Sequence, residues 1–182
     1  HIVVVVPPNG TEIENTVRKF THTKFKPKFA IQEKPLGTGD ALKSAVPFLK
    51  INQPTLILFG DVPLISSQSL KRFAKNFEKT SALRILTTKI KKPKGYGRII
   101  RNNRKEILLI REETDASTKE KKIMEIFAGP MLINTKVLKK LIQEVDQNNK
   151  QNEFYLTDLV AKAVSNNLAV SSLELKDSQE IL

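Results

Sequence analysis

Short apolar runs alternate along the chain with stretches in which apolar residues recur every three or four positions. The runs are rich in Val and Ile and predict strands, whereas the longer period predicts helices that bury one face. In the first half, strands are predicted at residues 2–6, 28–32, 55–60 and 82–90, and helices at 11–20, 40–49 and 66–77. The continuous runs at 2–6 and 55–60 are typical of strands buried on both faces.

The second half of the chain follows a different pattern. Two strands around an Asn-Asn-Arg turn are predicted at residues 97–113, an extended stretch at 121–134, helices at 135–145 and 156–167, and a last strand at 168–175. We expect the two halves to share one sheet. Because strands and helices alternate up to about residue 90, the fold class predicted is α/β: a Rossmann-like, mixed, mostly parallel sheet with helices on both faces.

One carboxylate, Asp61, interrupts the apolar stretch "TLILFGDVPLI" at 55–65. A buried, unpaired carboxylate is costly, so Asp61 either caps the next element or lies at the mouth of the fold and binds a ligand. Open α/β sheets bind ligands outside the carboxyl ends of their strands, and Asp61 follows a predicted strand. We therefore expect Asp61 at the ligand-binding edge.

Composition narrows the classes of function. The chain has 182 residues, 40% of them apolar and 27% charged, which suits one domain with a sizeable core. No stretch approaches the roughly 20 apolar residues of a membrane span, so no membrane partner is expected. The chain has no cysteine, which excludes disulfides, thiolate metal sites and Cys-His catalytic sets and fits a cytoplasmic location. With two histidines in the chain, no Ser-His-Asp set is expected either.

The net charge of +12 makes nucleic acid, acidic lipid and polyphosphate ligands plausible. The lysines are spread along the chain rather than gathered in one block, which favours solvated lysines. Aromatic residues are only 6% of the chain, too few for the stacking surface of a single-strand reader. No nucleic-acid partner is expected.

Two glycine-containing loops and three carboxylates are candidates for binding a ligand. The loop "LGTGDA" at 36–41 lets backbone approach a ligand at a helix N-terminus, although a tight turn needs the same residues. The loop "KPKGYGR" at 92–98 faces a ligand or is an ordinary turn between strands. The carboxylates Glu112, Glu113 and Asp115 could accept sugar hydroxyls or hold a metal; a solvated acidic corner is the interpretation favoured for Glu113 and Asp115.

Five segments, read in order, are more specific than any one alone. The segments "QEKPLGTGDA", "LILFGDVPLI", "GYGRI", "IREETDAS" and "NEFYLTDLV" resemble the uridyltransferase domain of bacterial bifunctional N-acetylglucosamine-1-phosphate uridyltransferase/glucosamine-1-phosphate acetyltransferase. The resemblance covers nearly the whole chain. It implies a fold of the nucleotide-diphospho-sugar transferase type and transfer of uridylyl from UTP to N-acetylglucosamine 1-phosphate. A nucleotidyltransferase for another sugar 1-phosphate and a non-catalytic nucleotide-binding remnant are the alternatives.

The resemblance also implies roles for individual residues. Asp61 matches the catalytic aspartate that binds Mg²⁺, the implied cofactor. Gln32 matches the residue that pairs with the uracil edge, and Glu112 matches a carboxylate that accepts sugar hydroxyls. The implied substrate-binding positions are Gln32, Gly37, Thr38, Gly60, Tyr96, Gly97, Glu112, Tyr155 and Thr157, with Glu153 in the same segment as the last two.

The chain also departs from the family pattern. The resemblance implies one nucleotidyltransferase domain over 1–182 that is incomplete at both ends: a glycine-rich triphosphate loop is expected before residue 1, and a second magnesium ligand and an acetyltransferase β-helix domain after Leu182. From this we expect that these residues alone are inactive and that a longer parent forms a homotrimer. Phe127 also replaces the family's sugar-contacting asparagine, which predicts weaker sugar binding. The alternative is a register shift that buries Phe127 and lets Asn134 or Asn152 meet the sugar.

Overall fold

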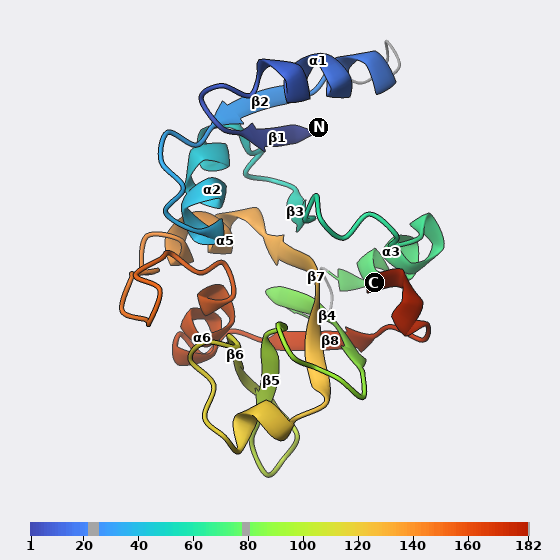
Figure 1. Ribbon diagram of the computed structural model, residues 1–182, viewed down its shortest axis with the longest axis vertical. Coiled ribbons are helices and arrows are strands. Elements are labelled where there is room, and N and C mark those ends of the chain that lie inside the picture. The colour runs from blue at the N-terminus through green and yellow to red at the C-terminus, as the bar shows by residue number, and fades with distance from the viewer. Residues whose placement is uncertain (22–25, 78–80, 182) are drawn as a thin grey trace.

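The computed structural model describes residues 1–21, 26–77 and 81–181 (Figure 1). The strands are β1 (Val3–Val6), β2 (Lys28–Ile31), β3 (Pro54–Ile57), β4 (Leu83–Lys89), β5 (Arg98–Arg101), β6 (Ile107–Arg111), β7 (Glu125–Asn134) and β8 (Val170–Glu174). The α-helices are α1 (Thr11–Phe20), α2 (Thr38–Ala45), α3 (Ser67–Ala74), α5 (Thr135–Leu141) and α6 (Asp158–Ser165). Short 3₁₀ helices are η1 (Val46–Phe48), η2 (Glu120–Lys122) and η3 (Ser178–Ile181).

The α/β class is confirmed, but the expectation of a mostly parallel sheet is wrong. In the described part of the chain, β1–β2 and β4–β8 pair in parallel, whereas β3–β7, β4–β7, β5–β6 and β5–β7 are antiparallel. The alternation of strands and helices ends at β4, and β5 and β6 are joined by a tight turn that only antiparallel strands allow.

The expectation of one shared sheet is also wrong for the first two strands. The larger sheet has the order β6-β5-β7-β4-β8, with β3 added along β7, and β1 and β2 form a separate two-stranded sheet. Figure 1 shows β1, β2 and α1 together at one end of the molecule, away from β4–β8.

Strand β7 is the centre of the larger sheet and is buried on both faces. On one face, Ile126, Ala128 and Leu132 pack with Phe73 of α3 and Ile181 of η3. On the other face, alternate β7 residues pack with α5 and α6. The prediction of helices on both faces is therefore confirmed for this sheet. The strands predicted to be buried on both faces, at 2–6 and 55–60, correspond to β1 and β3, and this prediction is wrong. Both are only half-buried and pair with a neighbour along one edge, whereas β4 and β7 are buried on both faces.

A bulge in β7 divides its pairing into two parts. The register with β4 shifts between Ile85 and Thr87, and Gly129 on β7 has a φ of 102°. Strand β4 pairs along one edge of β7, and both β5 and β3 pair along the other edge. On that second edge, Arg98 of β5 pairs with Ile126, and Ile57 of β3 pairs with Met131. Residues 127–130 therefore lie between the two strands that pair along this edge.

The helices are short. Helix α3 begins after Ser66, whose side chain accepts a hydrogen bond from Ser69 N at 3.2 Å, as its serine-rich start predicts. Helix α1 is present as predicted but leaves Ile13 and Phe20 47% and 76% exposed. Among the described residues, no helix has the length and apolar character needed to cross a bilayer.

Candidate active site

A cavity of about 350 Å³ lies where β3 and β5 part along β7. The β7 residues that line it, Phe127, Ala128 and Gly129, belong to the segment between the two pairings. Asp61 lines it from the loop after β3, and Tyr96 from the loop before β5. The volume falls within the ordinary range for a small-molecule site.

Most of the predicted site residues meet in this cavity. It is lined by Thr38, Asp61, Tyr96, Gly97, Glu112, Glu153, Tyr155 and Thr157. Gln32, Gly37 and Gly60 are outside the lining. Gln32 lies beside Gly37, because its Nε2 donates to Gly37 O at 3.1 Å and to Asp40 Oδ2 at 2.9 Å. Gly60 directly precedes Asp61 in the same loop.

Glu112 is held by a neighbour that is itself buried. The Thr157 hydroxyl donates to Glu112 Oε1 at 2.7 Å, and Thr157 is only 5% exposed. Burial raises the pKa of Glu112; the hydrogen bond from Thr157 opposes this rise, and the charge of Asp115 adds to it. One carboxylate oxygen is thus fixed, which orients the group as an acceptor facing the cavity.

Gly97 is required by this close packing. A Cβ at residue 97 would lie 2.7 Å from Ile110 Cγ2 and 3.5 Å from Glu112 Oε2. A contact under 3 Å would force a neighbouring atom to move, so glycine lets this backbone pass Ile110 and lie against Glu112.

The glycine loop at 36–39 docks on the segment at 154–156. Gly39 N donates to Phe154 O at 2.7 Å, Phe154 N donates to Leu36 O at 2.8 Å, and Leu156 N donates to Thr38 Oγ1 at 3.0 Å. Gly37 has a φ of 108°, and a Cβ there would lie 2.6 Å from Phe154 O. These glycines therefore allow two protein segments to approach, and this packing brings Thr38 to the cavity.

Gln151 lines the cavity but was missed by the sequence reading. Its Oε1 accepts from the Tyr155 hydroxyl at 2.7 Å and from the Thr114 hydroxyl at 3.2 Å. Burial raises the pKa of Tyr155. The surrounding sequence, "QNNKQNEF", reads as an ordinary polar loop, so no local signal distinguishes Gln151 from its neighbours.

Asp61 is the residue that fits a metal ion. Its side chain is exposed at the cavity and has no hydrogen-bond or ion-pair partner among the described residues. The described residues contain no group of three or more His, Cys, Asp or Glu side chains that could hold a metal. Mg²⁺ is commonly bound by one or two carboxylates together with substrate phosphates and water, so a single free carboxylate fits a site that the substrate completes.

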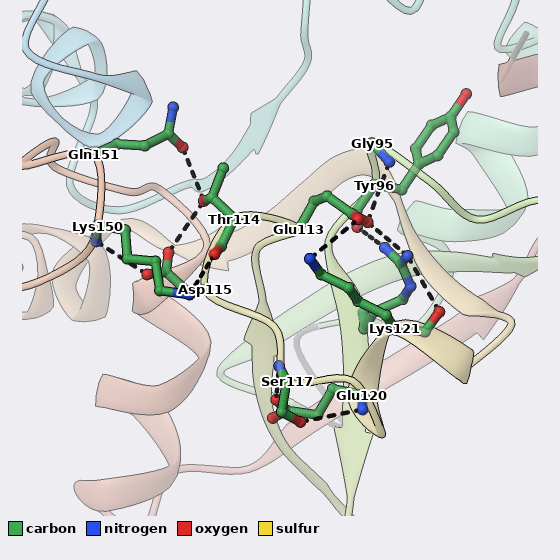
Figure 2. Close-up of polar contacts among 11 residues, drawn as sticks. Gly95, Tyr96, Glu113, Thr114, Asp115, Ser117, Glu120, Lys121, Lys150 and Gln151 are labelled. Carbon is green, nitrogen blue, oxygen red and sulfur yellow. Dashed lines mark hydrogen bonds and ion pairs between the residues drawn. The ribbon is translucent and has the colours of Figure 1, made fainter.

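The acidic corner after β6 is not solvated as expected. Glu113 pairs with Arg98 at 2.6 Å, and Asp115 Oδ1 accepts from Lys150 N at 3.0 Å (Figure 2). The interpretation favoured for Glu113 and Asp115 was therefore wrong, since both carboxylates are engaged by groups that are distant in sequence.

Phe127 belongs to both the cavity lining and the core. It is 8% exposed, and its ring meets Phe59 edge-on at a centroid distance of 6.1 Å. Neither asparagine of the alternative lines the cavity. Asn134 caps α5 by accepting from Lys136 N at 3.0 Å, and Asn152 is exposed in a loop. Among the described residues, no asparagine lines the cavity beside Phe127.

Known proteins resemble this chain in sequence. The family model described as nucleotidyl transferase matches residues 1–178. The bifunctional protein GlmU of Buchnera aphidicola subsp. Acyrthosiphon pisum (strain Tuc7) is 39% identical over 155 residues, which are 85% of this chain and 33% of that protein. The GlmU proteins of Janthinobacterium sp. (strain Marseille) and Paraburkholderia phymatum are 46% and 37% identical, covering 80% and 100% of this chain and 32% and 39% of their own lengths. The chain spans about a third of the length of these curated relatives.

A solved structure has a similar fold. It is a crystal structure of a Bacillus anthracis protein described as a glucose-1-phosphate thymidylyltransferase in complex with a sucrose, with a TM-score of 0.73. The match covers 96% of this chain and 68% of that chain, at 19% identity. At this identity the likeness concerns the fold alone.

Proposed function

This chain belongs to the nucleotidyl transferase family, and we propose that it transfers uridylyl from UTP to N-acetylglucosamine 1-phosphate, giving UDP-N-acetylglucosamine and pyrophosphate. The observation that carries the proposal is one cavity that gathers a free carboxylate, Asp61, with a fixed acceptor, Glu112, and the Gly-Tyr-Gly loop. The relatives at 37–46% identity and the matching motifs support the same assignment.

The reaction needs positioning and charge neutralisation more than a covalent catalyst. A phosphate oxygen of the sugar phosphate bonds to the α-phosphorus of UTP, and the bond from that phosphorus to the bridging oxygen breaks, so that pyrophosphate leaves in line. Mg²⁺, when bound, neutralises charge on the phosphate oxygens. Asp61 is the residue that would hold it, because its carboxylate is exposed at the cavity.

The sugar is bound, in this proposal, by the fixed carboxylate and the neighbouring loop. Glu112 accepts a sugar hydroxyl with the oxygen that Thr157 does not engage. The backbone of Tyr96 and Gly97 lies beside the sugar phosphate. Tyr155 and Glu153 complete the wall on this side of the cavity.

Uracil is assigned to the edge of the cavity near Thr38. Both Nε2 hydrogens of Gln32 are engaged, by Gly37 O and by Asp40 Oδ2. The oxygen Oε1 is then the atom of Gln32 that can pair with uracil, as an acceptor for its N3–H. Cytosine has no hydrogen at N3, so this orientation favours UTP over CTP.

The direct test is pyrophosphate release, with Mg²⁺, from the full-length protein that carries these residues, measured for UTP and CTP and for N-acetylglucosamine 1-phosphate and glucose 1-phosphate. We expect the highest kcat/KM for UTP with N-acetylglucosamine 1-phosphate. A higher kcat/KM for glucose 1-phosphate would favour the alternative sugar, for which the apolar Phe127 in the lining is the supporting observation. UTP binding by calorimetry without pyrophosphate release would overturn the enzyme assignment and favour a nucleotide-binding remnant.

Two further expectations belong to this proposal. Assembly into a homotrimer follows from the resemblance and is tested by the mass of the protein in solution. A cytoplasmic location fits the absence of cysteine and is tested by fractionation of cells.

A further inference from the structure

The corner after β6 sends its side chains in two directions. Figure 2 shows Glu113 pointing toward Gly95, whereas Thr114 and Asp115 point toward the segment that carries Lys150 and Gln151. Lys150 Nζ donates to Thr114 O at 2.8 Å, and the Thr114 hydroxyl donates to Gln151 at 3.2 Å. The corner thus contacts two segments that line the cavity.

The carboxylate of Glu113 accepts two hydrogen bonds and also lies near a lysine ammonium group. Its Oε2 accepts from Gly95 N at 3.2 Å and from Arg98 Nη2 at 2.6 Å, and its Oε1 lies 3.9 Å from Lys121 Nζ. The hydrogen bond from Arg98 is the main reason that the pKa of Glu113 is below its usual range. The group is therefore ionised at neutral pH.

Arg98 connects this carboxylate to the other side of the loop. Its side chain is 1% exposed, and its Nη1 donates to the Tyr96 carbonyl. Among the described residues its Nε has no partner, so the charge of the buried guanidinium is balanced chiefly by Glu113. Because an unpaired buried charge is costly, the pair stays closed in the folded protein.

The loop has little packing of its own at Gly95. This residue has a φ of 92°, and a Cβ built on it would meet no atom within 4 Å. The contact from Glu113 therefore fixes Gly95, which other side chains leave open, and the contact through Arg98 reaches the Tyr96 carbonyl. Tyr96 also packs against the core, and Gly97 O accepts from Phe127 N at 2.9 Å, so Gly95 is the part of the loop that depends most on Glu113.

We infer that Glu113 is a positioning residue that holds Gly95, Tyr96 and Gly97 at the cavity and so sets the site of the sugar phosphate. Glu113 is itself outside the cavity lining, and it acts through the loop rather than on the substrate. This inference rests on the proposed function only for the identity of the ligand that the loop meets.

The chain offers a matched control at Glu120. This carboxylate also pairs with an arginine, Arg111, at 3.3 Å, and accepts from Ser117 N at 2.7 Å. The pKa of Glu120 is likewise below its usual range, mainly through its hydrogen bonds with Ser117. In the described part of the chain, Glu120 makes no hydrogen bond or ion pair with the loop at 95–97, so Glu120→Gln removes a comparable charge without touching the cavity.

The first measurement needs no substrate. Hydrogen exchange of the backbone at 94–98 is compared for Glu113→Gln, Glu120→Gln and the unchanged protein. We expect Glu113→Gln to speed this exchange by about fivefold, the difference between a charge-assisted and a neutral hydrogen bond. Glu120→Gln should leave it unchanged. Equal exchange in all three proteins would overturn the inference.

The second measurement is kinetic. We expect Glu113→Gln to raise KM for N-acetylglucosamine 1-phosphate by about fivefold, with KM for UTP unchanged, because the loop meets the sugar phosphate. Faster exchange without this change in KM would overturn the positioning role. If the unchanged full-length protein shows no turnover, the proposed function fails, and the dissociation constant of the sugar phosphate from calorimetry takes the place of KM in the same comparison.

A second variant guards against misfolding. Glu113→Asp keeps a negative charge near Arg98 but shortens the reach to Gly95 N. We expect a folded protein with faster exchange at 94–98 and a raised KM. Exchange and KM like those of the unchanged protein would overturn the inference, since the charge alone would then suffice.

Discussion

Asp158 opens α6 directly after Thr157, and its carboxylate is half-buried. Among the described residues, no group donates a hydrogen bond to it. Burial raises the pKa of Asp158 from 3.8 to about 6; the negative charge of Asp146 adds to the rise, and Lys162 opposes it. A carboxyl whose pKa is higher in the folded than in the unfolded state costs stability once it ionises.

The sign and size of this cost follow from the two pKa values. Below about pH 4 the group is protonated in both states and costs nothing; the cost grows as the pH rises and is complete above about 6. At 1.4 kcal/mol per pKa unit the full cost is about 3 kcal/mol. Because the side chain is partly exposed, solvent screening reduces this figure, and we expect about 1–2 kcal/mol.

Asp158→Asn should therefore raise the free energy of unfolding by about 1–2 kcal/mol at pH 8, with no gain at pH 4. Urea unfolding followed by circular dichroism at both pH values measures this. The matched control is Glu120→Gln, because hydrogen bonding by Ser117 holds the pKa of Glu120 below its usual range. This control should lose stability at pH 8. An Asp158→Asn protein that is no more stable at pH 8 than the unchanged protein would refute the reasoning.

Three further outcomes are expected of the full-length protein. Asp61→Asn should lower kcat by about 100-fold or more with the fold intact, and turnover near that of the unchanged protein at saturating Mg²⁺ would exclude the metal role; Glu12→Gln on the exposed α1 is the control. Phe127→Asn should lower the free energy of unfolding by about 3 kcal/mol and, if it restores a sugar contact, raise kcat/KM for the sugar phosphate about tenfold. A fall in kcat/KM with the lower stability would assign Phe127 to the core alone. Duplex DNA should bind only loosely and lose affinity steeply with salt, so a salt-tolerant specific site would contradict the scattered-lysine interpretation.

The local elements were predictable because their signals are local. The serine cap at Ser66 and the spacing of Leu70 and Phe73 predict α3 from neighbouring residues, although the predicted end at 77 lies beyond the observed end at Ala74. The sequence was less able to predict which strands pair with each other. The run at 2–6 has the composition of a central strand, yet β1 is half-buried in a two-stranded sheet, because burial depends on which strands lie beside it.

In the candidate site, too, some residues could be predicted from the sequence and some contacts could not. Asp61, Glu112 and Thr157 came from motif resemblance, and the cavity brings all three together. The pair of Arg98 with Glu113 could not be predicted, since it depends on the β5–β6 register, in which Arg98 lies opposite Arg111. The corner looked solvated because sequence alone does not show which cation reaches it.

The pairing of β7 with β3, and of β4 with β8, has a consequence for how the protein is made. Pro54 pairs with Asn134 and Leu83 with Val170, so the sheet joins parts of the chain that leave the ribosome far apart in time. Contacts of such long sequence separation close loops at high entropic cost and form slowly. The cavity between β3 and β5 cannot exist until β7 has been synthesised and paired, and Thr157 joins it later still. Ligand binding is therefore acquired near the end of folding, and a ligand that binds the native cavity also reports that the chain has folded.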